Sequence, residues 1–129
     1  MARIIMAEDD EIVGAIAGDA LIAAGHGFGL LDNGADAMKV IRARRPDLVI
    51  LDCNMPEVSG LLVLRQMRDS MDLCDTPVLI LTGRQSTRDS EIAFYEGADD
   101  YMTKPFDPDE LVFRVNELLA RKAGGKAGP

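Results

Sequence analysis

The chain has few cysteines and no long apolar run. Cys53 and Cys74 are its only cysteines, too few for the disulfide framework of a small secreted domain. We therefore expect two reduced thiols and a cytoplasmic protein. No apolar run approaches the roughly 20 residues that a membrane-spanning helix needs, and no signal-peptide pattern precedes the first predicted strand. These absences argue against a secreted or membrane-inserted protein.

Basic residues are also scarce. The chain carries 14 lysines and arginines against 22 acidic residues, a net charge of −8. This charge opposes binding to nucleic-acid phosphates and anionic membranes, so we expect no direct nucleic-acid binding. The single histidine, His26, lies between two glycines and is expected to be a surface residue, with no partner that would make it a ligand or a base.

What the chain does contain is enough apolar sequence for one domain. Apolar residues make up 47% of 129 residues, which suits a single globular domain with a real core. We expect residues 1–122 to form that domain. Residues 123–129 are rich in glycine and have little to bury, so we expect a flexible tail or the remnant of a linker.

Short apolar runs alternate with segments of helical periodicity. The runs fall at 4–7, 27–31, 48–52, 78–81 and 100–102, and the helical segments at 12–24, 33–45, 61–71, 86–97 and from 108 onward. Asp10 is expected to cap the first helix, and Asp107 with Pro108 to begin the last. Five strands alternating with five helices predict an α/β fold with a doubly wound, five-stranded parallel sheet.

The most informative run is Leu48-Val49-Ile50-Leu51-Asp52. Four uninterrupted apolar residues fit a strand buried on both faces by helices. Asp52 then lies at the carboxyl end of a central strand, where open α/β sheets bind their ligands.

Polar residues also end the other predicted strands. Glu8 and Asp9 follow the first, Thr82 ends the fourth and Lys104 follows the fifth, so they should converge on Asp52 at one edge of the sheet. Carboxylates crowded in this way repel one another, and a divalent cation that prefers oxygen ligands, such as Mg²⁺, relieves the repulsion. Lysine and threonine suit the binding of a phosphoryl oxygen.

Simpler interpretations exist for each of these residues. Acids at a helix start are often caps, an isolated lysine is usually a solvated charge, and Tyr101 is by default a core residue. The register of the acidic pair is also open, because Asp9 and Asp10 are an alternative to Glu8 and Asp9.

Four motifs together resemble the receiver domain of two-component response regulators. They are Ile-Ile-Met-Ala-Glu-Asp-Asp at 4–10, Leu-Val-Ile-Leu-Asp-Cys-Asn-Met-Pro-Glu-Val-Ser-Gly at 48–60, Leu-Thr-Gly at 81–83 and Gly-Ala-Asp-Asp-Tyr-Met-Thr-Lys-Pro-Phe at 97–106. The resemblance covers residues 3 to about 122, so it implies that residues 1–122 form a receiver domain. It implies a flavodoxin-like (βα)5 fold with strand order 2-1-3-4-5.

The resemblance also implies roles for the strand-end residues. Asp52 resembles the phosphoacceptor, and Glu8 and Asp9 resemble the Mg²⁺ pair, with Asp9 the direct ligand and Glu8 acting through water. Lys104 is expected to pair with Asp52 and then with the phosphoryl group. Thr82 is expected to direct its hydroxyl towards that group.

Further roles follow from the same resemblance. Asn54 is expected to bind the metal through its backbone carbonyl. Its side chain and that of Arg84 are expected to modulate the lifetime of the phosphoryl group. Tyr101 resembles the aromatic switch that responds to Thr82, and a cis peptide bond is expected between Lys104 and Pro105.

One aromatic residue does not fit the core pattern of the last helix. Phe113 lies about 160° from the centre of the apolar stripe, so it should be exposed, and Tyr95 is expected to flank it. We interpret the face formed by the fourth helix, the fifth strand and the fifth helix as a partner surface, with a homodimer as one option. A single exposed apolar residue without a role is the alternative.

The function implied is a Mg²⁺-dependent phosphoacceptor switch. A histidine kinase or histidine phosphotransfer protein is expected to supply the phosphoryl group, and an unknown target protein to read the modified state. Such a domain catalyses its own phosphorylation and dephosphorylation but is not a turnover enzyme. The alternatives are a Mg²⁺-dependent phosphatase of the haloacid-dehalogenase type and an adaptor that is never phosphorylated.

Overall fold

The computed structural model describes residues 2–53, 55, 57–83 and 97–127, with side chains described as far as residue 123. The expected helix at 86–97 therefore lies outside the described residues, except for Gly97. None of the helices in the described ranges is long and apolar enough to cross a membrane.

Five strands form one parallel sheet in the order β2-β1-β3-β4-β5, which confirms the predicted topology. They are β1 (Arg3–Ala7), β2 (Gly27–Leu31), β3 (Leu48–Asp52), β4 (Val78–Thr82) and β5 (Asp100–Thr103). All residues of β3 and β4 are buried, because helices cover both faces of the sheet. β2 and β5 are the edge strands.

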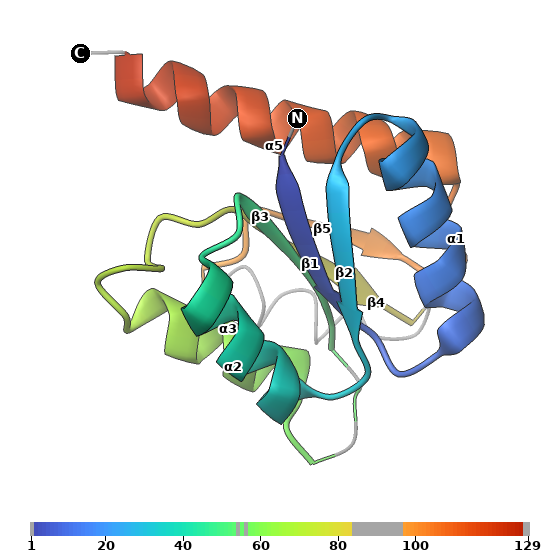
Figure 1. The fold of residues 1–129 in the computed structure, drawn as a ribbon, viewed down its shortest axis with the longest axis horizontal. Coiled ribbons are helices and arrows are strands. Elements are labelled where there is room, and N and C mark those ends of the chain that lie inside the picture. Colours follow the sequence, from blue (N-terminus) through green and yellow to red (C-terminus); the bar gives the residue numbers. More distant parts are fainter. Residues whose placement is uncertain (1, 54, 56, 84–96, 128–129) are drawn as a thin grey trace.

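Helices lie on both sides of this sheet (Figure 1). They are α1 (Glu11–Ala23), α2 (Gly34–Arg44), α3 (Gly60–Arg68) and α5 (Pro108–Ala127). Helices α1 and α5 cover one face, where Leu21, Ile50 and Leu111 share a core cluster. Helices α2 and α3 cover the other face, where Ile41 and Leu64 belong to a second cluster. This is the expected doubly wound architecture.

Local sequence signals set where the helices begin. The Asp10 side chain accepts hydrogen bonds from the amides of Ile12 and Val13 at the start of α1. The Asp107 carboxylate accepts from the amide of Asp109 at the start of α5. Both predicted caps are confirmed. α5 continues to Ala127, beyond residue 122, where we placed the end of the domain; a flexible tail at 123–129 stays a prediction.

Helix α3 ends earlier than its periodicity predicts. The pattern through Met71 placed that residue on the buried face, but α3 ends at Arg68 and Met71 is 93% exposed. The chain turns after Asp69, and Leu73 is buried there instead. The predicted extension to Met71 is wrong because a turn after the helix brings a different apolar residue to the core.

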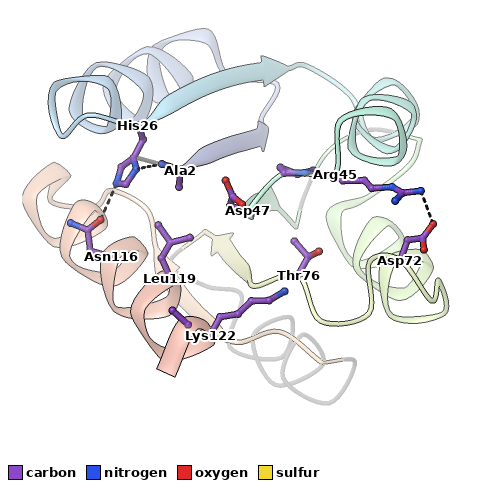
Figure 2. Close-up of a pocket in the computed structure, with 11 residues that line it drawn as sticks. Ala2, His26, Arg45, Asp47, Asp72, Thr76, Asn116, Leu119 and Lys122 are labelled. Carbon is purple, nitrogen blue, oxygen red and sulfur yellow. Dashed lines mark hydrogen bonds and ion pairs between the residues drawn. The ribbon is translucent and has the colours of Figure 1, made fainter. Parts of the chain in front are cut away.

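His26, expected to be a simple surface residue, is instead half-buried and hydrogen-bonded. Its Nδ1 accepts a hydrogen bond from the Ala2 amide at 3.2 Å, and its Nε2 lies 2.9 Å from Oδ1 of Asn116 on α5 (Figure 2). With Nδ1 as acceptor, Nε2 carries the proton that is donated to Asn116. The imidazole thus ties the start of β1 to α5, at the end of the sheet opposite the predicted site.

Candidate functional site

The site is built at the carboxyl edge of the sheet, beginning with Asp52. This residue ends β3, and it is 2% exposed. Gly60, the first residue of α3, packs directly against the Asp52 carbonyl, and a Cβ at that position would collide with it. The close approach of α3 to the strand therefore requires glycine at position 60, and it fixes the backbone that carries the carboxylate.

Two acids from the end of β1 face Asp52. Carboxylate oxygens of Glu8, Asp9 and Asp52 all lie within 4.8 Å of one another. Glu8 is buried, whereas Asp9 is exposed. Asp10 caps α1 instead. Of the two registers that the sequence allowed, the structure brings Glu8 and Asp9 to the third carboxylate.

Lys104 reaches these acids from the other side. The Lys104–Pro105 bond is cis, as predicted, and the Lys104 amide donates a 2.7 Å hydrogen bond to the Thr82 carbonyl. From this anchored backbone, Nζ lies 2.6 Å from Oε1 of Glu8 and 3.3 Å from Oδ2 of Asp52. The expected pairing with Asp52 is therefore present, but the shorter ion pair is with Glu8.

Burial and close charges shift the ionisation of this cluster. The pKa of the Glu8 carboxyl is raised from 4.5 to about 7, mainly because burial penalises its charged form. Asp52 acts in the same direction, and Lys104 opposes both. Burial by itself would lower the pKa of Lys104, but the hydrogen bond to Glu8 and the charge of Asp52 outweigh it, so this pKa is raised.

The Thr82 hydroxyl is buried and has no hydrogen bond to any of the described residues. Thr82 ends β4 next to Asp52 in the sheet and is 0% exposed. Its Oγ1 has no hydrogen-bond partner among the residues that the structure describes. A buried hydroxyl without a hydrogen bond is unfavourable, so an acceptor group bound beside Asp52 would be a suitable partner for it.

The remaining predicted residues lie away from the acidic cluster or outside the described part. Tyr101 is on the edge strand β5 and is 37% exposed, so the default core placement is wrong. Phe113 on α5 is 64% exposed, as its helical position predicted. Asn54, Arg84 and Tyr95 lie outside the described residues, and the roles given to them stay predictions.

Sequence reasoning missed Arg68, the last residue of α3. Its guanidinium donates hydrogen bonds to the carbonyls of Gly97 and Thr76 and pairs with Asp99 at 3.0 Å. These contacts hold the chain immediately before β5. Basic residues at a helix end are common enough that nothing in the sequence singled out this one.

The comparisons with known proteins agree with this geometry. The family model described as response regulator receiver domain matches residues 4–116. Curated relatives include the response regulator MprA of Mycobacterium sp. (strain KMS), 40% identical over 119 residues, and that of Mycobacterium leprae (strain TN), 38% identical. Each match covers 92% of this chain and 51% of the relative. The chain thus spans about half the length of these proteins.

Solved structures give the same result. A response regulator from Chloroflexus aurantiacus has a TM-score of 0.89 at 30% identity, covering 92% of this chain and 98% of that one. The receiver domain of a Francisella response regulator has a TM-score of 0.85 at 30% identity, covering 94% and 98%. With a family match over most of its length and relatives at this identity, the chain belongs to the receiver domains of two-component response regulators.

Proposed function

We propose that this receiver domain is a phosphoacceptor switch in which Asp52 receives the phosphoryl group. The observation that carries the proposal is a buried carboxylate at the sheet edge, with Lys104 3.3 Å away and the acids of β1 beside it. This arrangement provides a nucleophile and a cation for the phosphoryl oxygens. In phosphoryl transfer, such positioning and charge neutralisation carry most of the catalysis.

The donor set fits Mg²⁺. Three carboxylates from two strands lie within reach of one ion, and hard oxygen ligands are those that Mg²⁺ prefers. Glu8, Asp9 and Asp52 would hold it, together with the backbone carbonyl of Asn54. When bound, the ion would neutralise charge on the transferred phosphoryl group. One lysine leaves an excess of negative charge among these acids, which supports a divalent cation.

The transfer itself uses residues of this chain. A carboxylate oxygen of Asp52 attacks phosphorus, the P–N bond of the donor's phosphohistidine breaks, and the released imidazole of the donor takes up a proton. Lys104, 3.3 Å from Asp52, would hold the carboxylate in place for attack. After transfer, the same ammonium pairs with a phosphoryl oxygen.

The signal would leave the site through Thr82. Its buried hydroxyl, which has no partner within the described ranges, would donate to the phosphoryl oxygen, and Thr82 is adjacent to Thr103 on β5. Tyr101 lies two residues earlier on that edge strand. A movement of Thr82 could therefore displace β5 next to Tyr101, which we propose as the aromatic switch.

The partner surface that we propose lies beyond this switch. Tyr101 and Phe113 expose aromatic side chains on β5 and α5, and exposed aromatics are frequent anchors of interfaces. A target protein or a second copy of the chain would bind there. The donor is proposed to be a histidine kinase or a histidine phosphotransfer protein.

Asn54 and Arg84 are proposed to set the lifetime of the phosphoryl group. The dephosphorylation rate of Arg84→Ala, measured by loss of the modified mass over time, tests this role. An unchanged rate would remove Arg84 from the proposal.

Incubation with acetyl phosphate and Mg²⁺ tests the proposed function directly. A mass gain of one phosphoryl group is expected in the wild type and not in Asp52→Asn. Multiple turnover on a phosphomonoester would favour the phosphatase, although enzymes of that type carry the nucleophile after their first strand and this chain carries it on β3. No mass gain under any condition would favour an unphosphorylated adaptor.

A further inference from the structure

Two of the hollows that the described residues line, both away from the acidic site, differ in how their charges are partnered. The first, about 680 Å³, is at the amino edge of the sheet (Figure 2). Arg45 there pairs with Asp72 at 3.0 Å, and Lys122 donates to the Asp75 carbonyl. Because both cations already contact oxygen atoms of the protein, this hollow gives no reason to propose a charged ligand.

The second hollow is a groove between the edge strand β2 and helix α2, with a volume of about 650 Å³. We call it the β2–α2 groove. Ile5, Leu31, Val40 and Ala43 contribute apolar surface, and Arg3, Lys39 and Arg44 contribute the charged groups.

Glycines in β2 create this hollow. Phe28 and Leu30 direct their side chains to the α1 face, where they lie over Gly18 and Gly14. Gly27 and Gly29 therefore face α2, because side chains of a strand alternate between its two faces. A Cβ at Gly29 would meet nothing within 4 Å. The missing side chains leave backbone exposed beneath α2.

The outer edge of β2 is open as well. The Gly27 amide and the Leu31 carbonyl bond towards β1, so by the alternation of a parallel ladder the backbone groups of Phe28 and Leu30 point outward. In the described part of the chain no strand pairs with this edge. Residues 27–31 also contain no proline or charge, and their register with β1 is unbroken. Proline, charge and a bulge, which often protect an edge strand, are therefore absent from these five described residues.

Every charged residue that lines the groove is basic. Arg3, Lys39 and Arg44 are exposed, and no carboxylate within the described ranges pairs with their side chains. Asp47 accepts a hydrogen bond from the Arg3 amide at 2.7 Å and not from the Arg3 side chain. In a chain of net charge −8, an unpaired basic rim over an apolar floor is complementary to an acidic partner.

We propose that the β2–α2 groove docks an extended, acidic segment of a partner protein, which adds to the sheet as a strand beside β2. Backbone pairing with Phe28 and Leu30 would hold the segment, as in other cases of strand addition. Its alternate side chains would enter the space above Gly27 and Gly29, and its carboxylates would meet Lys39, Arg44 and Arg3. β2 has five residues, so the paired length is about 16 Å.

The experiment follows amide proton–nitrogen correlation spectra of the unphosphorylated protein during titration with a short peptide of alternating glutamate and valine. Saturable shifts are expected at Phe28 and Leu30, with slower hydrogen exchange of these two amides. The same peptide with lysine in place of glutamate should not bind. A peptide N-methylated at alternate residues should lose binding, because it cannot form the ladder.

Matched charge reversals test the rim. Arg44→Glu should weaken peptide binding and raise its dissociation constant about tenfold. Arg42→Glu, in the same last turn of α2 but outside the groove, should leave it nearly unchanged. Equal losses in both variants, or equal binding of the N-methylated peptide, would overturn the proposal. Concentration-dependent shifts of β2 without peptide would also overturn it, because they would assign the groove to self-association.

Discussion

Replacing Thr82 by valine should stabilise the unmodified protein while weakening its phosphorylated state. Valine has nearly the shape of threonine and removes the buried hydroxyl that lacks a hydrogen bond within the described residues. Such a group costs about 1–3 kcal/mol, so we expect the free energy of unfolding to rise by about 1–2 kcal/mol. The backbone hydrogen bond from Lys104 to the Thr82 carbonyl is unaffected by the substitution.

In the phosphorylated state, the wild type should instead be stabilised more than Thr82→Val. There the wild-type hydroxyl would bond to a charged phosphoryl oxygen, a contact worth about 1.5–3 kcal/mol. Thermal unfolding with saturating acetyl phosphate and Mg²⁺ should therefore give a larger increase in melting temperature for the wild type than for Thr82→Val.

A matched control uses the neighbouring strand. Thr103 is the register partner of Thr82 and is exposed, so Thr103→Val removes a hydroxyl that water already satisfies. Urea unfolding of the unmodified proteins should rank Thr82→Val above both Thr103→Val and the wild type. A Thr82→Val protein that is less stable than the wild type would refute the inference that this hydroxyl is unsatisfied.

Three further predictions follow from the same geometry. Without metal, the folded-state pKa of Glu8 is about 7 against 4.5 unfolded, so the folded state binds the proton more tightly and stability rises as pH falls from about 7 to 4.5. The gain is on the order of 3 kcal/mol, and urea unfolding in EDTA should show this pH dependence reduced in Glu8→Gln. Gly60→Ala forces a Cβ against the Asp52 carbonyl and should lower the free energy of unfolding by about 1–3 kcal/mol. The control Gly29→Ala enters open space and should change stability little, and equal effects would contradict the packing argument. Phe113→Ala should weaken self-association or target binding of the phosphorylated protein in analytical ultracentrifugation or pull-down, with folding unchanged because the ring is exposed; no change in either would leave Phe113 without a role.

The sequence was most informative where a single local signal decides the structure. The apolar run before Asp52 predicted a buried strand because a short run bounded by turn signals fits a central strand covered on both faces. The ends of parallel strands meet at one edge, and this rule predicted that Lys104 and an acidic pair after β1 lie near Asp52. It left open whether that pair is Glu8 and Asp9 or Asp9 and Asp10.

Prediction failed where contacts between residues far apart in the sequence, or the path of the chain after a helix, determine the structure. The partner of His26 is Asn116, 90 residues away, and no local pattern announces such a contact. Met71 matched the helical period of α3, but the chain had already turned and buried Leu73 instead. Likewise, the sequence placed Lys104 near the acids without indicating that its shorter ion pair would be with Glu8.

The short Lys104–Glu8 ion pair helps to explain how the metal-free site accommodates several neighbouring carboxylates. Two buried carboxylates beside each other are unfavourable when both are ionised, and two features of this site reduce the repulsion. Lys104 lies between Glu8 and Asp52, 2.6 Å from one and 3.3 Å from the other, and the raised pKa of Glu8 allows it to hold a proton near neutral pH. A divalent cation would make that proton unnecessary, so cation binding should release protons and strengthen as pH rises through about 7. Calorimetric titration of Mg²⁺ in buffers of different ionisation enthalpy measures the release. An observed enthalpy that does not vary with the buffer would show that Glu8 is already ionised in the metal-free protein.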